Sequence, residues 1–226
     1  MLYTLEAVRD NLRNRDGKRV FYLGQGDTLT VSAREYLQKE RIEILPARQA
    51  RPDRYRLENG GFMEEKPEDM THLNGDVLVS KNHPRIVFRG AMDTLESLLL
   101  LGCRYAPRYK EELTQVWELA GEILACEVLE KPLAEKKLGG MTAAELRSRS
   151  HRPQDFYGQP HFRPSPGDGE VLLWLNRIRC AARAAELKAV AAIPGRKDIL
   201  QAMNRMSSFL YLLMIQEKAA ISADIP

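Results

Sequence analysis

The chain has 226 residues, 44% of them hydrophobic, which suits one main hydrophobic core with a small appended unit. Its formal net charge of +3 is too small and too dispersed to indicate a nucleic-acid-binding protein. The longest uninterrupted apolar run is Phe209–Ile215, far short of the roughly 20 residues that a membrane-spanning helix needs, so no membrane association is expected.

Cysteine usage indicates a reducing compartment. Cys103, Cys126 and Cys180 stand singly in predicted helices, and no two of them have the spacing of zinc ligands or of a disulfide framework. The first residues lack the pattern of a secretory signal peptide. A cytoplasmic protein with reduced thiols is the expectation that fits both features.

Residues 1–48 are expected to form a small α+β N-terminal unit. The predicted order is helix, strand, helix, strand, over Thr4–Arg13, Arg19–Leu23, Ser32–Lys39 and Ile42–Leu45. The second helix would open with the capping box Ser32-Ala-Arg-Glu35. Docking to partner proteins or covering an active site fits this unit better than DNA binding, because its second helix is not basic.

Residues 49–65 are rich in Arg, Pro, Asn and Gly and are predicted to be a linker, because they have no hydrophobic periodicity. Residues 66–226 are expected to form an all-α main domain, a bundle of four to five helices. After an irregular or briefly extended stretch over 71–81, helices are predicted over Arg85–Leu101, Arg108–Leu129, a short segment from Thr142, Glu170–Ala192 and Asp198–Lys218. Ser150–Gly169 contains four prolines and three glycines and is predicted to be a functional loop.

The helix predicted over Glu170–Ala192 carries charges on its apolar side. At about 100° per residue, Arg179, Arg183 and Glu186 fall on one stripe, with leucines before them and a valine after them. Charges in an apolar stripe need an acidic partner or a phosphate-rich ligand. A surface ladder of ion pairs is the alternative interpretation.

Two more helices carry polar residues in apolar surroundings. Asn204, Ser208 and Tyr211 form a polar stripe on the last helix, which is apolar on most sides. Such a stripe faces either a bound polar ligand or a buried polar network. Asp93 lies in the apolar half of the helix predicted over 85–101 and is a candidate partner for one of the arginines, with Arg89 as its local alternative.

Four segments, in this order and spacing, resemble the corrinoid adenosyltransferases. They are Thr71-His-Leu through Gly90-Ala-Met-Asp93, then Ser150-His-Arg-Pro153, then the helix with Arg179, Arg183 and Glu186, and last Ile199–Ser208. The chain is most similar to the ethanolamine-utilisation branch (EutT-type), which is related to the propanediol-utilisation branch (PduO-type). The resemblance covers Lys66 to about Lys218.

This resemblance implies roles for nucleotide-binding residues. Thr71 and Lys81 match the segment that holds the triphosphate of ATP. Four further residues would bind ATP, with Glu186 holding its Mg²⁺: Arg85, Arg183, Glu186 and Asn204.

The resemblance also implies the catalytic residues. Asp93 and Arg179 match a pair that joins neighbouring subunits at the active site. Phe162, in the long loop, matches an aromatic residue that excludes the lower ligand of the cobalt in cobalamin. The chain departs from the pattern at Ala184, where the family has a second arginine, and over Arg51–Glu65, which contains no Cys or His. No structural zinc or iron is therefore expected.

The implied activity is transfer of the 5′-deoxyadenosyl group of ATP to cob(I)alamin, which makes adenosylcobalamin and releases triphosphate. The implied partners are a flavoprotein-type reductase, further copies of the chain in a dimer or trimer, and proteins of an ethanolamine-utilisation microcompartment in the cytoplasm. The alternative is a non-catalytic bundle that binds or delivers the corrinoid within a metabolic compartment.

Overall fold

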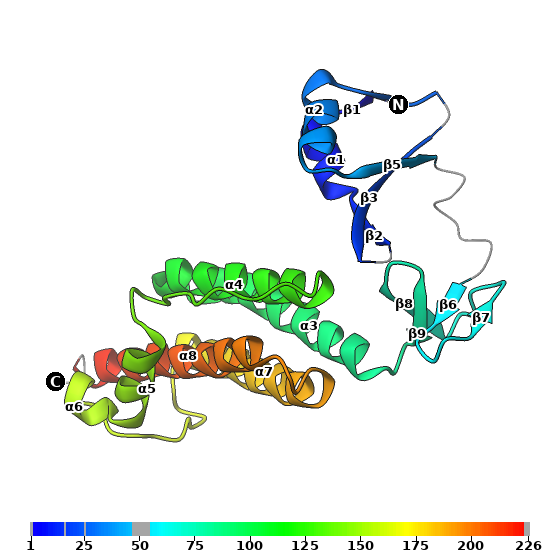
Figure 1. The fold of residues 1–226 in the computed structure, drawn as a ribbon. Coiled ribbons are helices and arrows are strands. Elements are labelled where there is room, and N and C mark those ends of the chain that lie inside the picture. The colour runs from blue at the N-terminus through cyan, green and yellow to red at the C-terminus, as the bar shows by residue number, and fades with distance from the viewer. Residues whose placement is uncertain (1, 16, 25, 47–54, 224–226) are drawn as a thin grey trace. The chain divides into compact units, whose positions relative to one another are not determined.

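A computed structural model describes residues 2–15, 17–24, 26–46 and 55–223 of the chain. The chain divides into two compact units, Met1–His83 and Pro84–Pro226 (Figure 1). The first unit combines short strands with two helices, and the second unit is helical. The predicted fold class, an all-α main domain with a small α+β N-terminal unit, is confirmed.

The first part of the N-terminal unit combines a two-stranded sheet, β1-β4, and a three-stranded sheet, β2-β3-β5, with two helices. Its elements are β1 (Leu2–Tyr3), α1 (Leu5–Asp10), β2 (Arg13–Arg15), β3 (Lys18–Leu23), β4 (Thr28–Leu29), α2 (Val31–Lys39) and β5 (Glu43–Pro46). Strand β3 is central, with β2 antiparallel on one side and β5 parallel on the other. Helix α2 is capped by the side chain of Thr30, two residues before the predicted capping box, because that hydroxyl accepts from the amide of Ala33.

A four-stranded sheet follows within the same unit. Its strands are β6 (Tyr55–Leu57), β7 (Phe62–Met63), β8 (Met70–Asn74) and β9 (Val77–Ser80), in the spatial order β7-β6-β9-β8. Two of these strands fall where the sequence predicts a linker, and residues 49–54 of that linker lie outside the described residues. Strands of two or three residues are too short to show periodicity, and β6 is held by parallel pairing with the distant β9. The boundary between the compact units accordingly follows His83 instead of Glu65.

The second unit is a bundle of four long helices with two short ones. Its elements are α3 (Pro84–Tyr105), the 3₁₀-helix η2 (Pro107–Tyr109), α4 (Lys110–Val128), α5 (Ala143–His151), α6 (Pro153–Tyr157), α7 (Glu170–Ala192) and α8 (Lys197–Ala223). The predicted capping box at Thr142 is present. Helix α6 lies inside the predicted loop, started by Pro153 and ended by Gly158 in the left-handed conformation. Over the described part of the chain, no helix has the length and apolarity needed to cross a bilayer.

Helix α7 packs against both α3 and α8, which places it inside the bundle. Its buried residues change from large to small along the chain: Leu172, Leu175, Ile178, Ala181, Ala182, Ala185 and Ala189. Small side chains let helix backbones approach closely. The contact with α3 is also close, because a β-carbon at Gly102 would collide with Ile178.

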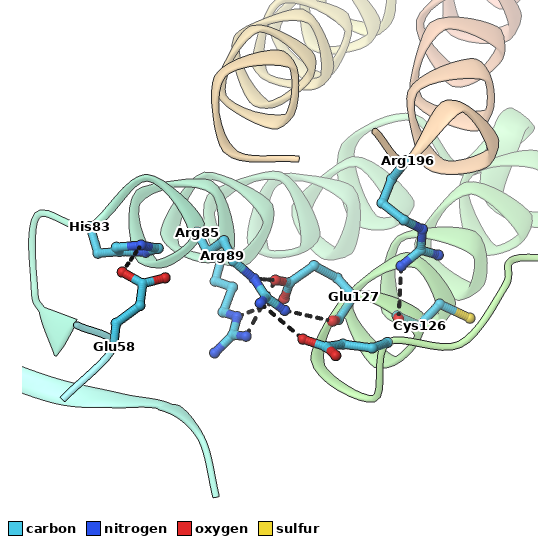
Figure 2. Close-up of polar contacts among 8 residues, drawn as sticks. Glu58, His83, Arg85, Arg89, Cys126, Glu127 and Arg196 are labelled. Atoms are coloured by element: carbon cyan, nitrogen blue, oxygen red, sulfur yellow. Dashed lines mark hydrogen bonds and ion pairs between the residues drawn. The ribbon is translucent and has the colours of Figure 1, made fainter. Parts of the chain in front are cut away.

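A buried carboxylate joins the beginning of α3 to the end of α4. Glu127 is 1% exposed, and its carboxylate binds the Arg85 guanidinium and the Arg89 guanidinium, with Arg89 Nε 2.7 Å from Oε2 (Figure 2). Arg85 Nη2 also donates to the Glu127 carbonyl at 2.9 Å. Nearby, Arg196 donates to the Cys126 carbonyl at 3.3 Å. The last carbonyl groups of a helix lack a donor within the helix, and here the arginine side chains supply those donors at the C-terminus of α4.

Glu127→Gln is expected to destabilise the bundle strongly. The variant leaves Arg85 and Arg89 without their buried counter-charge, and breaking a buried ion pair costs about 3–5 kcal/mol. The melting temperature should therefore fall by about 10 °C or more, measured by circular dichroism. Glu130→Gln is the control, because Glu130 also pairs with Arg85 but its side chain is 63% exposed. Equal melting temperatures of the two variants would contradict the role given to Glu127.

Candidate functional site

A cavity of about 610 Å³ lies in the helical unit between α5, α7, α8 and the loop that joins α6 to α7. Such a volume is typical of small-molecule sites. It is lined by Ser150, His151, His161, Phe162, Pro164, Arg179, Arg183, Asn204, Ser207, Ser208, Tyr211 and Met214. The structure thus brings together four residues that the resemblance implies: Phe162, Arg179, Arg183 and Asn204.

Helix α7 presents Arg179 and Arg183 to the cavity from the edge of its buried face. Arg179 is half-buried and Arg183 is exposed. The sequence predicts both arginines within an apolar stripe, but that stripe is not buried along its whole length, since Val190 is 51% exposed. The buried face is carried instead by the neighbouring alanines. The two guanidinium groups therefore reach the cavity without crossing the core.

The cavity has a positive lining. It contains two arginines, and none of the lining residues in the described chain is Asp or Glu. Burial, and next the charge of Arg183, lowers the pKa of the Arg179 guanidinium. Two like charges in a partly buried site repel each other, and a bound anion removes that repulsion. The arrangement therefore favours a polyanionic ligand.

A polar chain behind the cavity connects α7 to α8. Asn204 Nδ2 donates to Glu186 Oε1 at 2.9 Å, and Arg205 Nη2 donates to Asn204 Oδ1 at 2.6 Å. Burial, and next the charge of Arg147, lowers the pKa of Arg205, while Glu186 opposes that shift. The Glu186 carboxylate is half-buried and follows Arg183 by about one helical turn. A single carboxylate at this place fits a Mg²⁺ ion that is held mainly by phosphate oxygens.

The aromatic wall of the cavity is built around Tyr211 of α8. The Tyr211 hydroxyl lies 2.9 Å from His161 Nδ1, and the two rings are stacked with centroids 5.7 Å apart. Phe162 also stacks on Tyr211, at 6.3 Å between centroids. The Arg179 guanidinium lies over the same ring, 5.1 Å from its centroid. The Tyr211 ring therefore contacts two residues of the loop, His161 and Phe162, and the guanidinium of Arg179.

The loop that carries Phe162 is anchored a second time. Lys218 Nζ lies 2.6 Å from Asp168 Oδ1 and 5.9 Å from the centroid of the Phe162 ring. Asp168 Oδ2 accepts the Ser165 amide at 2.7 Å. The hydrogen bond from Lys218 lowers the pKa of Asp168, so this ion pair persists at neutral pH.

Other predicted site residues lie outside the cavity lining. Asp93 is exposed on α3, and within the described chain no ion pair joins it to Arg179. Arg85 is bound to Glu127 and Glu130, so its assignment to the nucleotide stays a prediction. Thr71 and Lys81 belong to the β8–β9 hairpin of the first compact unit, where Thr71 pairs with Val79 and the Lys81 amide donates to the Asp69 carbonyl at 2.8 Å.

Sequence reasoning missed several lining residues. His161, which lines the cavity, and Lys218, which anchors the loop beside it, have partners about 50 positions away in the chain, and such pairing leaves no local pattern. Tyr211 was identified only as part of a polar stripe on α8. The stripe itself was a useful signal, because Asn204, Ser208 and Tyr211 all line the cavity.

The chain was compared with known proteins. The profile of the family described as Cobalamin adenosyltransferase matches residues 62–217. The corrinoid adenosyltransferase EutT of Salmonella typhimurium is 32% identical over 157 residues, which are 66% of this chain and 59% of that protein. The corrinoid adenosyltransferase EutT of Escherichia coli is 31% identical over 157 residues with the same coverage. The chain thus spans 59% of the length of these relatives.

Solved structures show the same fold. Two variants of a PduO-type ATP:corrinoid adenosyltransferase from Lactobacillus reuteri, complexed with cobalamin and ATP, both match with a TM-score of 0.52 and 18% identity. The match covers 69% of this chain in both comparisons, and 89% and 91% of the respective neighbours.

The positive cavity is expected to bind inorganic tripolyphosphate. At saturating concentration this polyanion should raise the melting temperature of the parent protein by about 5 °C, because a ligand that binds only the folded state stabilises it. Arg183→Gln should lose most of that increase. Arg177→Gln is the matched control, because Arg177 is exposed on α7 and does not line the cavity. Equal increases in both variants would show that the polyanion binds elsewhere.

Proposed function

We propose that this chain, which belongs to the cobalamin adenosyltransferase family, is an ATP:corrinoid adenosyltransferase. It transfers the 5′-deoxyadenosyl group of ATP to the cobalt of cob(I)alamin. The observation that carries the proposal is the cavity lined by Arg179 and Arg183, without acidic lining residues in the described chain, beside an aromatic wall. The arginines of the lining, above all Arg183, suit the triphosphate, and the aromatic wall suits a flat macrocycle.

The proposed reaction needs no nucleophile from the protein. The electron pair of cobalt(I) forms a bond to the 5′-carbon, while the bond from that carbon to the phosphate oxygen breaks and triphosphate leaves with its electron pair. The protein has to orient the two substrates and neutralise the leaving group. Arg183 would contact the triphosphate, and Glu186 with Asn204 would hold its Mg²⁺. Thr71 and Lys81 are proposed to contribute to the same phosphates.

Phe162 is proposed to act on the corrinoid. Cobalt(II) is hard to reduce while it keeps an axial ligand, and an aromatic side chain in that position would exclude the ligand. Phe162 lies in the cavity wall, held between Tyr211 and Lys218, so its ring is already oriented there. The electron itself would come from a flavoprotein-type reductase.

The protein is proposed to work as a homo-oligomer, a dimer or trimer. Asp93 is exposed, and Arg179 is half-buried with no acidic side chain beside it in the cavity lining, so the two can pair between subunits. Two relatives are EutT proteins, which supports a role in ethanolamine utilisation. With that role, a cytoplasmic location in association with a microcompartment is proposed.

Anaerobic incubation with Mg-ATP and cob(I)alamin tests the function directly. The absorbance spectrum should change to that of adenosylcobalamin, with one equivalent of triphosphate released. A bundle that only carries the corrinoid would bind it without consuming ATP, and this result would refute the proposal.

Phe162→Ala should separate reduction from transfer. It is expected to lower the rate at least about tenfold when cobalt(II) has to be reduced on the enzyme. A factor of ten corresponds to an activation barrier that is about 1.4 kcal/mol higher. When cob(I)alamin is generated chemically, the loss should be much smaller. Equal losses in the two assays would mean that Phe162 only packs the loop.

Asp93 and Arg179 should behave as a coupled pair. Asp93→Ala and Arg179→Ala are each expected to weaken subunit association, because each strands the partner's charge. Sedimentation equilibrium would then give a double-mutant effect smaller than the sum of the two single effects, by about 0.5–3 kcal/mol. Additive effects would show that the two side chains do not pair.

A further inference from the structure

We propose that Tyr211 and His161 form a positioning pair that holds Phe162 in the cavity wall. The pair acts through the loop at 158–169, which crosses α8 next to the cavity. The consequence for corrinoid reduction rests on the proposed function, whereas the effect on the loop does not.

The loop beside Phe162 has no backbone framework of its own. Within the described chain, no backbone–backbone hydrogen bond involves residues 159–164. The loop also contains prolines, which lack the amide donor. Its conformation therefore depends on side-chain contacts, and the contacts of His161 are immediately next to Phe162.

The His161 ring is held from both of its nitrogens. Nε2 lies 3.2 Å from the His151 carbonyl, which accepts only, so Nε2 carries a proton and donates. In the neutral ring Nδ1 is then the acceptor, and the Tyr211 hydroxyl donates to it at 2.9 Å. The two bonds fix the tautomer and orientation of the ring, and they join the end of α5, the loop and α8.

Tyr211 also connects the loop to the charged side of the cavity. Its ring stacks on Phe162 with an interplanar angle of 22°, and it carries the guanidinium of Arg179 on its face. The hydroxyl and the ring therefore have separable functions. The hydroxyl holds His161, whereas the ring contacts Phe162 and Arg179.

This separation defines the variants. Tyr211→Phe removes only the hydroxyl and keeps the ring contacts. His161→Ala removes both hydrogen bonds of the imidazole, while His161→Asn retains an amide oxygen near the position of Nδ1. Tyr36→Phe is the matched control, because its ring faces Arg9 in the first compact unit and it does not line the cavity.

Limited proteolysis of the protein without ligands by chymotrypsin is the first measurement, because this protease cleaves after aromatic residues and Phe162 must leave the cavity wall to be cut. In Tyr211→Phe and His161→Ala, cleavage after Phe162 should be about three- to tenfold faster than in the parent, as expected from the loss of one or two neutral hydrogen bonds. His161→Asn should recover part of the protection, and Tyr36→Phe should match the parent. Unchanged cleavage in Tyr211→Phe would overturn the positioning role.

Kinetics with the two cobalt states are the second measurement. Starting from cob(II)alamin with a reductant, Tyr211→Phe should turn over about three- to tenfold more slowly, with a smaller fraction of the bound cobalt(II) lacking its axial ligand by absorbance. With cob(I)alamin supplied chemically, its turnover should fall less than it does from cob(II)alamin, so the ratio of the two rates should drop. A purely structural role would instead lower both rates alike.

The two proposals fail separately in this design. If the parent protein transfers adenosyl groups but Tyr211→Phe has parental cleavage and kinetics, only the positioning inference is wrong. If the parent protein transfers nothing while cleavage after Phe162 still becomes faster in Tyr211→Phe, the proposed function is wrong and the loop contact stands.

Discussion

The approach of α7 to both α3 and α8 is the constraint on which the rest of the helical unit depends. A helix with two packed sides must bury residues over much of its surface, and α7 does this with alanines in its second half. Because alanine side chains are short, the longer side chains of Arg179, Arg183 and Glu186 project beyond the contact. The close packing that stabilises the bundle therefore also presents the charges of the site.

Two arginine pairs, one on α3 and one on α7, differ in whether a carboxylate of the protein balances their charge. On α3, Arg85 and Arg89 share the buried carboxylate of Glu127. On α7, Arg179 and Arg183 face a cavity whose described lining residues include no carboxylate. An ion pair inside the protein is structural, because it needs no ligand. Arg179 is half-buried beside the cavity, and a partly buried cation without a carboxylate in the described lining favours a bound anion, which is why the second pair, and not the first, indicates the binding site.

Helix positions were largely predictable from the sequence, because each long helix has a repeating apolar face. The ends were less predictable, since α3 and α8 continue past the predicted Leu101 and Lys218 to Tyr105 and Ala223. Helix α7 begins and ends where its periodicity predicts, and Thr142 caps α5 as its motif requires. The strands β6 and β7 were not predictable, because each is too short for a pattern, and β6, which pairs with β7, is also held by β9 about 20 residues further along the chain. The contacts of His161 and Lys218 were missed for the same reason, since only the folded bundle brings residues about 50 positions apart together.

The polar stripe on α8, formed by Asn204, Ser208 and Tyr211, arranges the residues of the site along the axis of that helix. Asn204 lies at the charged end with Glu186 and Arg205, and Tyr211 lies at the aromatic end with His161 and Phe162. Seven residues of α-helix separate the two ends by about 10 Å. In the proposed reaction the phosphates and the corrinoid must be held apart while the 5′-carbon is brought to cobalt. A single rigid helix can set that separation, because both ends are then fixed by the same backbone and neither depends on a flexible connection.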